Sequence, residues 1–417
     1  MPRFALMMTL FLLVSTAWAG TTDATDTGGA EQALNLTGSA RAGYFSTSAN
    51  GQENVGTGSF WLKLAPDLGN NALMMVDGWV MNENSFTGPN QALLRQGYFN
   101  FSMGNADFRV GRQIIAWGRA DKLNPTDNLT PYNYTLLTPE SDDQRFGTGS
   151  VKATYHFQSL DVTGIWLPSF TPDVYPITPR PGVYFTQQSP KFNQTAIKLD
   201  RTGGDVDWSV SYFNGLDLTP DLGIDITSSA STNLILEHNR IQVLGMDAAT
   251  VMGRYGLRAE AAYTWTTYTR LNDPLVKKPF LYAVAGGDRT YFDNFNVNVQ
   301  YYFREVTDYQ NPENIINPFM RTVATQEAVL SHQLDQFDNG VSLRLSDNWL
   351  NHTLQGEIAG IYSQTYHDYA LKPKLIYAFN DRWTGTFGLE LFRGGPETFY
   401  GQLRGISSVF VEIKRNF

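Results

Sequence analysis

Apolar and polar residues alternate with a period of two along most of the chain. In the stretch 295–304 the odd positions are apolar or aromatic and the even positions are mostly polar. The stretches 206–212, 257–266, 341–346 and 383–391 repeat this pattern. Such alternation predicts β-strands that have one apolar and one polar face.

The strands of a soluble β-sandwich also alternate in this way. The length of the alternating runs and the residues at their ends distinguish a soluble sandwich from a membrane barrel. The runs are about ten residues long, which is the length of a tilted strand that crosses a bilayer. Aromatic residues stand near the ends of the apolar faces, as Tyr263 with Trp265 and Tyr301 with Phe303. Membrane barrels carry such aromatic girdles at both interfaces.

The connections between the runs alternate between short and long. Turn-type links at 67–70, 103–105, 203–205, 346–348 and 380–382 alternate with long polar stretches near 117–146, 168–191, 215–236 and 307–335. We therefore predict an all-β fold, a transmembrane antiparallel up-and-down barrel of 16–18 strands with short periplasmic turns and long extracellular loops. Sixteen strands result if the pair within 280–305 does not form. The eighteen expected strands are 33–45, 57–66, 71–82, 91–102, 105–116, 147–157, 159–168, 192–201, 205–214, 238–251, 254–268, 280–288, 293–305, 336–346, 350–364, 367–379, 383–393 and 403–417.

The N-terminus has the pattern of a secretory signal peptide. Arg3 provides a basic start, 4–14 is apolar, and Ala17-Trp18-Ala19 forms an A-x-A cleavage site. The apolar run is too short to span a membrane. We expect a signal peptide at 1–19, a periplasmic lead-in at 20–32 and an outer-membrane barrel at 33–417.

Composition excludes several other classes. The 417 residues include no Cys, which excludes disulfide scaffolds, Cys-ligated zinc, iron–sulfur clusters and covalent haem. Only 17% of the residues are charged, whereas soluble domains have about 25%. The formal net charge of −9 and the lack of basic runs argue against nucleic acid as a partner. We expect no cofactor and no metal.

The loop 117–146 is the first candidate for chemistry. A barrel of this width leaves an aqueous lumen unless something fills it, and Pro125, Pro131 and Pro139 stiffen this loop. A rigid loop that folds inward narrows a pore and brings charges across the solute path. The expected constriction and selectivity residues are Arg112, Arg119, Asp121, Asp127, Asp142, Asp143 and Arg145.

Basic residues at polar positions of the strands would face this loop across the lumen. Acidic groups on the loop and cationic groups on the wall would together create a transverse field. The direction of Arg109 and Arg112 depends on whether the chain bulges at Gly111. The expected wall residues are Arg41, Lys63, Arg109, Lys152, Lys198, Arg258, Arg304 and Arg344.

The C-terminal strand resembles the final strand of Gram-negative outer-membrane barrels. Val409, Val411 and Ile413 share one face, and Phe417 is the last residue. Arg415 departs from the pattern, because a hydrophobic residue is usual there. The resemblance implies that the barrel-assembly machinery recognises Phe417 and that the chain lies in outer-membrane lipid.

A block between 111 and 147 carries a second resemblance. Gly111-Arg112-Gln113, Trp117-Gly118-Arg119, Asn124-Pro125-Thr126-Asp127 and 143–147 are similar to a block in porin-like outer-membrane barrels that group loosely with alginate-export-type channels. The resemblance implies that Arg112, Arg119, Asp121, Asp127 and Arg145 lie in or beside a constriction. The acidic net charge argues against alginate itself.

Three functions are compatible with such a barrel. The main hypothesis is a porin that lets small hydrophilic solutes diffuse through a lumen narrowed by 117–146, with a homotrimer as one arrangement left open. The second is a scaffold or export outlet for a periplasmic electron-transfer protein or polysaccharide machinery. The third is a hydrolase, but His238 beside Glu237 and His367 beside Asp368 would face opposite sides of a strand. We therefore predict no enzymatic activity.

Overall fold

The computed structural model describes residues 35–47, 54–69, 71–82, 90–175, 183–188, 190–225, 232–266 and 273–417. The expected signal peptide and lead-in at 1–32 lie outside these residues. Among the described residues, no helix combines the length and the apolar character that a membrane span requires.

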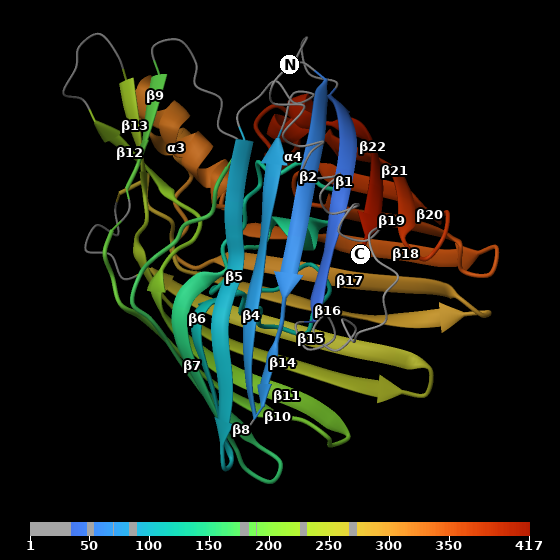
Figure 1. Cartoon of the computed structure of the whole chain (residues 1–417). Coiled ribbons are helices and arrows are strands. Elements are labelled where there is room, and N and C mark those ends of the chain that lie inside the picture. Colours follow the sequence, from blue (N-terminus) through green and yellow to red (C-terminus); the bar gives the residue numbers. More distant parts are fainter. Residues whose placement is uncertain are drawn as a thin grey trace, which may run out of the picture.

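The described chain forms one closed antiparallel barrel of eighteen long strands (Figure 1). Each long strand pairs with the next one along the chain, and β1 also pairs with β22, which closes the ring. The three-residue strand β3 (Asp67–Gly69) only extends the edge beside β4. The long strands are β1 (Leu36–Thr47), β2 (Val55–Leu64), β4 (Ala72–Asn82), β5 (Asn90–Met103), β6 (Ala106–Gln113), β7 (Thr148–His156), β8 (Asp161–Leu167), β10 (Gln194–Arg201), β11 (Val206–Leu216), β14 (Arg240–Met252), β15 (Tyr255–Thr266), β16 (Phe280–Tyr291), β17 (Phe295–Val306), β18 (Phe337–Trp349), β19 (Leu354–Ser363), β20 (Tyr369–Ala378), β21 (Trp383–Arg393) and β22 (Ser408–Asn416).

This arrangement confirms the predicted fold class and selects eighteen strands. All eighteen expected ranges overlap the observed strands, including β16 and β17, the pair that the sixteen-strand alternative leaves out. The predicted start of the last strand at 403 is wrong. Residues of α4 (Phe399–Gln402) and η3 (Leu403–Ile406) form helical turns there, and Thr398 caps α4 through a hydrogen bond to its Oγ1 from Gly401 N.

The two faces of the strands differ as the alternation predicts. Val299 and Tyr301 on β17 are 43% and 45% exposed, whereas their neighbours Asn298 and Gln300 are buried. Residues that pair across neighbouring strands lie on the same face of the sheet. The strand pairing therefore assigns inward and outward positions on every strand of the ring. Apolar side chains cover the outside, and polar side chains cover the inside.

One end of the barrel carries structure that the alternation does not predict. β9 (Val183–Gln187), β12 (Asp221–Asp225) and β13 (Thr232–Glu237) form a separate three-stranded sheet. The helix α3 (Pro318–Leu330) packs against it through Val323 and Ala324, as Figure 1 shows at one end of the barrel. The expectation of polar loops at 168–191, 215–236 and 307–335 is therefore incomplete. We call this group of β9, β12, β13, α3 and 273–279 the cap.

Candidate functional site

The segment that follows β6 lies inside the barrel. Its residues contact inward-facing side chains of β1, β10, β14, β15, β17, β18 and β20. These strands stand on different sides of the ring, so the segment 117–146 crosses the lumen instead of projecting from the rim.

Glu260 on β15 holds the beginning of the segment. Its Oε2 accepts hydrogen bonds from the N–H groups of Arg119 (3.0 Å) and Ala120 (3.1 Å). Its Oε1 accepts from the N–H and the Oγ1–H of Thr126, both at 2.8 Å. The Glu260 side chain is buried, and these donors surround it. A buried carboxylate requires such partners, so Glu260 and the segment depend on each other.

Arg119 forms the second anchor on the same side of the lumen. Its guanidinium forms ion pairs with Asp200 on β10 (2.7 Å) and with Asp247 on β14. Asp247 also accepts a hydrogen bond from Ser209 on β11. The segment thus presents a cation to carboxylates of the wall here.

Further around the ring from these anchors, and across the lumen at β1, the charges are reversed, because the segment supplies the acids. Asp121 lies 2.8 Å from Nε of Arg344 on β18, and Asp143 lies 2.6 Å from Arg41 on β1. Two further residues extend these contacts. Glu140 lies 3.0 Å from Lys374 on β20, and the side-chain amide of Gln300 on β17 forms hydrogen bonds of 2.8 and 2.7 Å with the backbone of Asp121.

Arg145 and Asp127 connect two parts of the segment to each other. Their ion pair measures 2.6 Å, and the guanidinium lies 4.5 Å from the ring centre of Tyr132. Burial raises the pKa of Asp127 to about 6, although Arg145 opposes this rise. Asp142, in contrast, is 73% exposed and lies 3.7 Å from Lys122.

Apolar contacts fix the same segment at two places. Trp117 and Leu129 pack against inward apolar side chains of β8, β10, β11, β14 and β15, among them Phe213 and Val243. Leu136 packs against Trp61 and other apolar residues of β2 and β4. These contacts explain why several strands are apolar on both faces in their loop-proximal halves.

The wall residues expected from the sequence all lie at inward positions of the register. Arg41 and Arg344 contact the segment, as described above. The remaining six do not form an ion pair with it. Arg109 Nε donates a hydrogen bond to Asn100 Oδ1 (3.3 Å), and its guanidinium lies over the Tyr98 ring. Lys198 pairs with Asp200, Arg258 pairs with Asp288, and Arg304 donates to the Ser331 carbonyl. In the register Lys63 stands opposite Thr37, and Lys152 stands opposite Arg109.

Arg112 lies apart from the other expected constriction residues. It pairs with Gly97 and Gly149 and has the same parity as Val110, which is 44% exposed on the outer face. Gly111 has a φ of 130°, but the register continues through it without a shift. The bulge that would have turned Arg112 inward is therefore not present, and the register places this residue on the outer face.

The sequence reasoning missed the wall residues that hold the segment. Glu260 and Asp247 stand at polar positions of alternating strands, where they resemble any other lumen-facing acid. Only the fold brings β15 and β14 beside a segment that is more than a hundred residues away in the chain. In the register Glu260 stands between Asp247 and Val284, so neither of its cross-strand partners is a base.

Three of the five histidines form hydrogen bonds with carboxylate, carbonyl or hydroxyl groups. Within the described residues, none of the five hydrogen-bonds to a serine. His156 lies between Asp107 and Asp161, His238 contacts the Asp217 carbonyl, and His367 contacts Tyr362.

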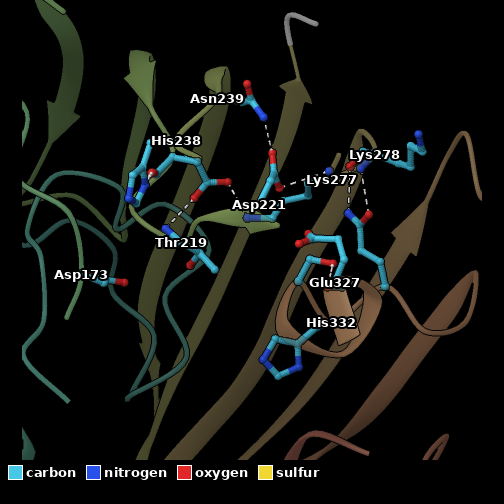
Figure 2. A network of polar contacts seen from close by, with 12 residues as sticks. Asp173, Thr219, Asp221, His238, Asn239, Lys277, Lys278, Glu327 and His332 are labelled. Atoms are coloured by element: carbon cyan, nitrogen blue, oxygen red, sulfur yellow. Dashed lines mark hydrogen bonds and ion pairs between the residues drawn. The ribbon is translucent and has the colours of Figure 1, made fainter. Parts of the chain in front are cut away.

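A second polar network lies in the cap (Figure 2). Lys277 is buried and forms an ion pair of 2.5 Å with Asp217, and its N–H donates to Asp221. Glu327 on α3 accepts a hydrogen bond of 2.7 Å from the N–H of Leu222. Burial raises the pKa of Glu327 well above its usual range, and the neighbouring Asp221 adds to this rise. The network ties α3 to β12 and to 273–279.

Comparisons with known proteins identify the fold through solved structures. No family model matches the sequence, and no curated protein matches it. The barrel is similar to OccD3 (OpdP) of Pseudomonas aeruginosa, with a TM-score of 0.55, 10% identity, and coverage of 92% of this chain and 90% of that one. OccAB3 of Acinetobacter baumannii has a TM-score of 0.54 and 9% identity, with coverage of 92% of this chain and 98% of that one. A BenF-like porin from Pseudomonas fluorescens Pf-5 has a TM-score of 0.54 and 9% identity, with coverage of 92% of this chain and 97% of that one. The chain therefore has the eighteen-strand barrel fold seen in outer-membrane porins.

Proposed function

We propose that the chain is an outer-membrane channel through which small hydrophilic solutes diffuse passively. The observation that carries this proposal is the segment 117–146, which is tied to opposite sides of a closed barrel by ion pairs of opposite polarity. A wide barrel with a polar interior forms an aqueous path, and a fixed charged segment across that path provides selectivity.

The proposal assigns the segment two functions. Arg119 and Glu140, together with the wall residues Glu260, Asp247 and Lys374, hold it in position. Asp121, Asp127, Asp142, Asp143 and Arg145 set the field that a solute meets. Among these, Asp142 is the most exposed, so its carboxylate is accessible to a passing ion beside Lys122 and Arg145.

The orientation follows from the loops. We place the short turns in the periplasm and the cap outside the cell, as expected for barrels of this class. The terminal Phe417 pairs with Gly38 through two backbone hydrogen bonds of 2.9 and 3.1 Å, and its ring stacks on Phe60. It remains 42% exposed on the outer face, which supports recognition by the assembly machinery during insertion. The proposal includes no catalytic step.

Single-channel recording in a planar bilayer tests the proposal. The purified and refolded chain, from residue 20 onward, is expected to give discrete ohmic steps under a salt gradient. Hydrophilic solutes that enter the lumen should block this current at millimolar concentration. A heat-modifiable, folded barrel that never conducts would overturn the channel and would favour the scaffold, whose partner should then co-purify with it.

A further inference from the structure

Arg415 is the residue at which the last strand departs from the usual pattern, and it lies on the outer face. Val409, Val411 and Ile413 precede it at the same parity and are 43%, 45% and 47% exposed. Its cross-strand partner is Trp383, and its guanidinium lies 5.7 Å from the centre of a Trp383 ring. Arg415 is therefore a cation on the apolar surface near the short-turn end of the barrel.

Arg289 repeats this arrangement on another part of the ring. It pairs with Val297, which shares the outer face with the exposed Val299. Its guanidinium lies 4.8 Å from the Tyr255 ring and 4.6 Å from the Tyr291 ring, and it donates a hydrogen bond of 2.5 Å to Tyr255 Oη. Tyr291 is the last residue of β16, so Arg289 also lies near the short-turn end.

Neither guanidinium has an acidic partner among the described residues. The inward-facing arginines Arg41, Arg119, Arg258 and Arg344 all form ion pairs with carboxylates. For Arg289 and Arg415, the Nε atoms are buried and have no hydrogen-bond partner. These buried Nε atoms do not reach the surface, so a ligand would meet the terminal nitrogens. Nη1 of Arg289 donates to Tyr255 Oη, whereas Nη2 of Arg289 and both terminal nitrogens of Arg415 have no hydrogen-bond partner among the described residues.

The position of these residues indicates what accepts their hydrogen bonds. A cation on the lipid-facing surface is costly at the middle of a bilayer and tolerated near its interfaces. Trp and Tyr rings mark the headgroup level. The anion available at that level is the phosphate of a phospholipid, and the planar guanidinium binds phosphate with two parallel hydrogen bonds.

We propose that Arg289 and Arg415 each bind the phosphate of a phospholipid headgroup at the short-turn boundary of the barrel, with Tyr255, Tyr291 and Trp383 packing beside the bound headgroup. This inference rests on membrane insertion, which the proposed function requires, but it does not rest on conduction. The two sites are on different strands and bind lipid independently.

Native mass spectrometry of the folded full barrel tests the proposal. The protein is delipidated in a non-ionic detergent and titrated with dioleoyl phosphatidylglycerol or with a digalactosyl diacylglycerol, which has no phosphate. The parent protein is expected to retain phosphatidylglycerol selectively. Arg289→Gln and Arg415→Gln should each lose one retained phosphatidylglycerol molecule, and the double variant should lose two.

Arg254→Gln provides the matched control. Arg254 is an exposed arginine in the short turn between β14 and β15, beyond the strand ends, so its loss should leave lipid retention unchanged. Heat-modifiable migration on a gel confirms that each variant is folded, and unchanged single-channel conductance separates this inference from the proposed function. Equal retention of phosphatidylglycerol by the parent and the double variant, or equal retention of the galactolipid by the parent, would overturn the proposal.

Discussion

Gly118 and Glu260 approach each other so closely that no side chain fits between them. A Cβ atom on Gly118 would lie 2.6 Å from Oε1 of Glu260 and closer still to Oε2. Gly118 also has a φ of 95°, a backbone conformation that residues other than glycine rarely adopt. The absence of a side chain here lets the backbone of the segment turn around the carboxylate, and this contact fixes where the segment crosses the lumen.

Gly118→Ala is therefore expected to displace the beginning of the segment from β15. The clash and the unfavourable φ together should cost about 1–3 kcal/mol of stability, and conductance should rise because the segment is held less firmly. Thermal unfolding and single-channel recording measure the two effects. Gly104→Ala is the control, because Gly104 also has a positive φ of 58° but has no atom within 4 Å of the added Cβ. A conductance equal to that of the parent would show that Glu260 does not position the segment.

Glu260→Gln tests the same contact from the wall. The amide keeps one acceptor oxygen, but its NH₂ group faces N–H or O–H groups whose hydrogen bonds the second carboxylate oxygen accepted. Leaving buried donors without acceptors costs about 1–3 kcal/mol, so the segment should loosen. Faster amide hydrogen exchange at Arg119, Ala120 and Thr126 would report this.

Glu390→Gln is the comparison for that experiment. Glu390 pairs with the half-exposed Lys372 at 2.7 Å on the wall, and its loss should leave exchange in the segment unchanged. Equal exchange rates in both variants would contradict the role assigned to Glu260.

The sequence predicts the barrel well because its strands are set by a local rule. In a strand that crosses a bilayer, each residue faces either lipid or lumen, so the alternation at 295–304 contains the information that places β17. The helix α3 was missed because the stretch around it is polar. Its signal is the helical spacing of Val323, Ala324 and Ala328 after the N-cap Asn317, whose side chain accepts from Phe319 N and Met320 N.

The candidate site could be predicted only in part, because its contacts depend on the tertiary structure. The charges of 117–146 are visible in the sequence, but their partners are not. Arg119 could pair with any inward acid, and only the curvature of the ring brings Asp247 to it. Arg112 shows the opposite case, in which a residue within the motif faces outward because the strand register continues through Gly111.

Asp121→Asn is expected to make the channel less cation-selective. The substitution keeps an oxygen that can accept the hydrogen bond from Asn298 (3.2 Å) but removes the charge that faces Arg344 at 2.8 Å. The released positive charge should move the reversal potential in a potassium chloride gradient toward that of chloride.

Arg344→Gln should shift the reversal potential in the opposite direction. Asp127→Asn is less informative on selectivity, because Asp127 is buried against Arg145. Unchanged reversal potentials in both Asp121→Asn and Arg344→Gln would refute a selective field at this pair.

The stability of the fold around Asp173 is expected to fall as the pH rises. Asp173 accepts hydrogen bonds from Tyr132 N (2.8 Å) and Tyr175 Oη (3.1 Å) outside the barrel strands. Burial raises its pKa from the ordinary 3.8 to about 7, although these two hydrogen bonds oppose the rise. Because the folded state favours the protonated acid, stability is greatest below pH 3.8, falls as the pH rises toward about 7, and then levels off.

Protection of the Tyr132 amide against hydrogen exchange, corrected for the intrinsic effect of pH, measures this change. Asp173→Asn keeps an acceptor oxygen for both bonds and does not titrate, so the protection should lose the part of its pH dependence that Asp173 contributes. The difference in protection between parent and variant separates the effect of Asp173 from that of Asp127. Burial also raises the pKa of Asp127, to about 6. A parent whose protection is constant between pH 4 and pH 7, or a variant that follows the parent throughout, would show that burial of Asp173 does not set the pH dependence of stability in this region.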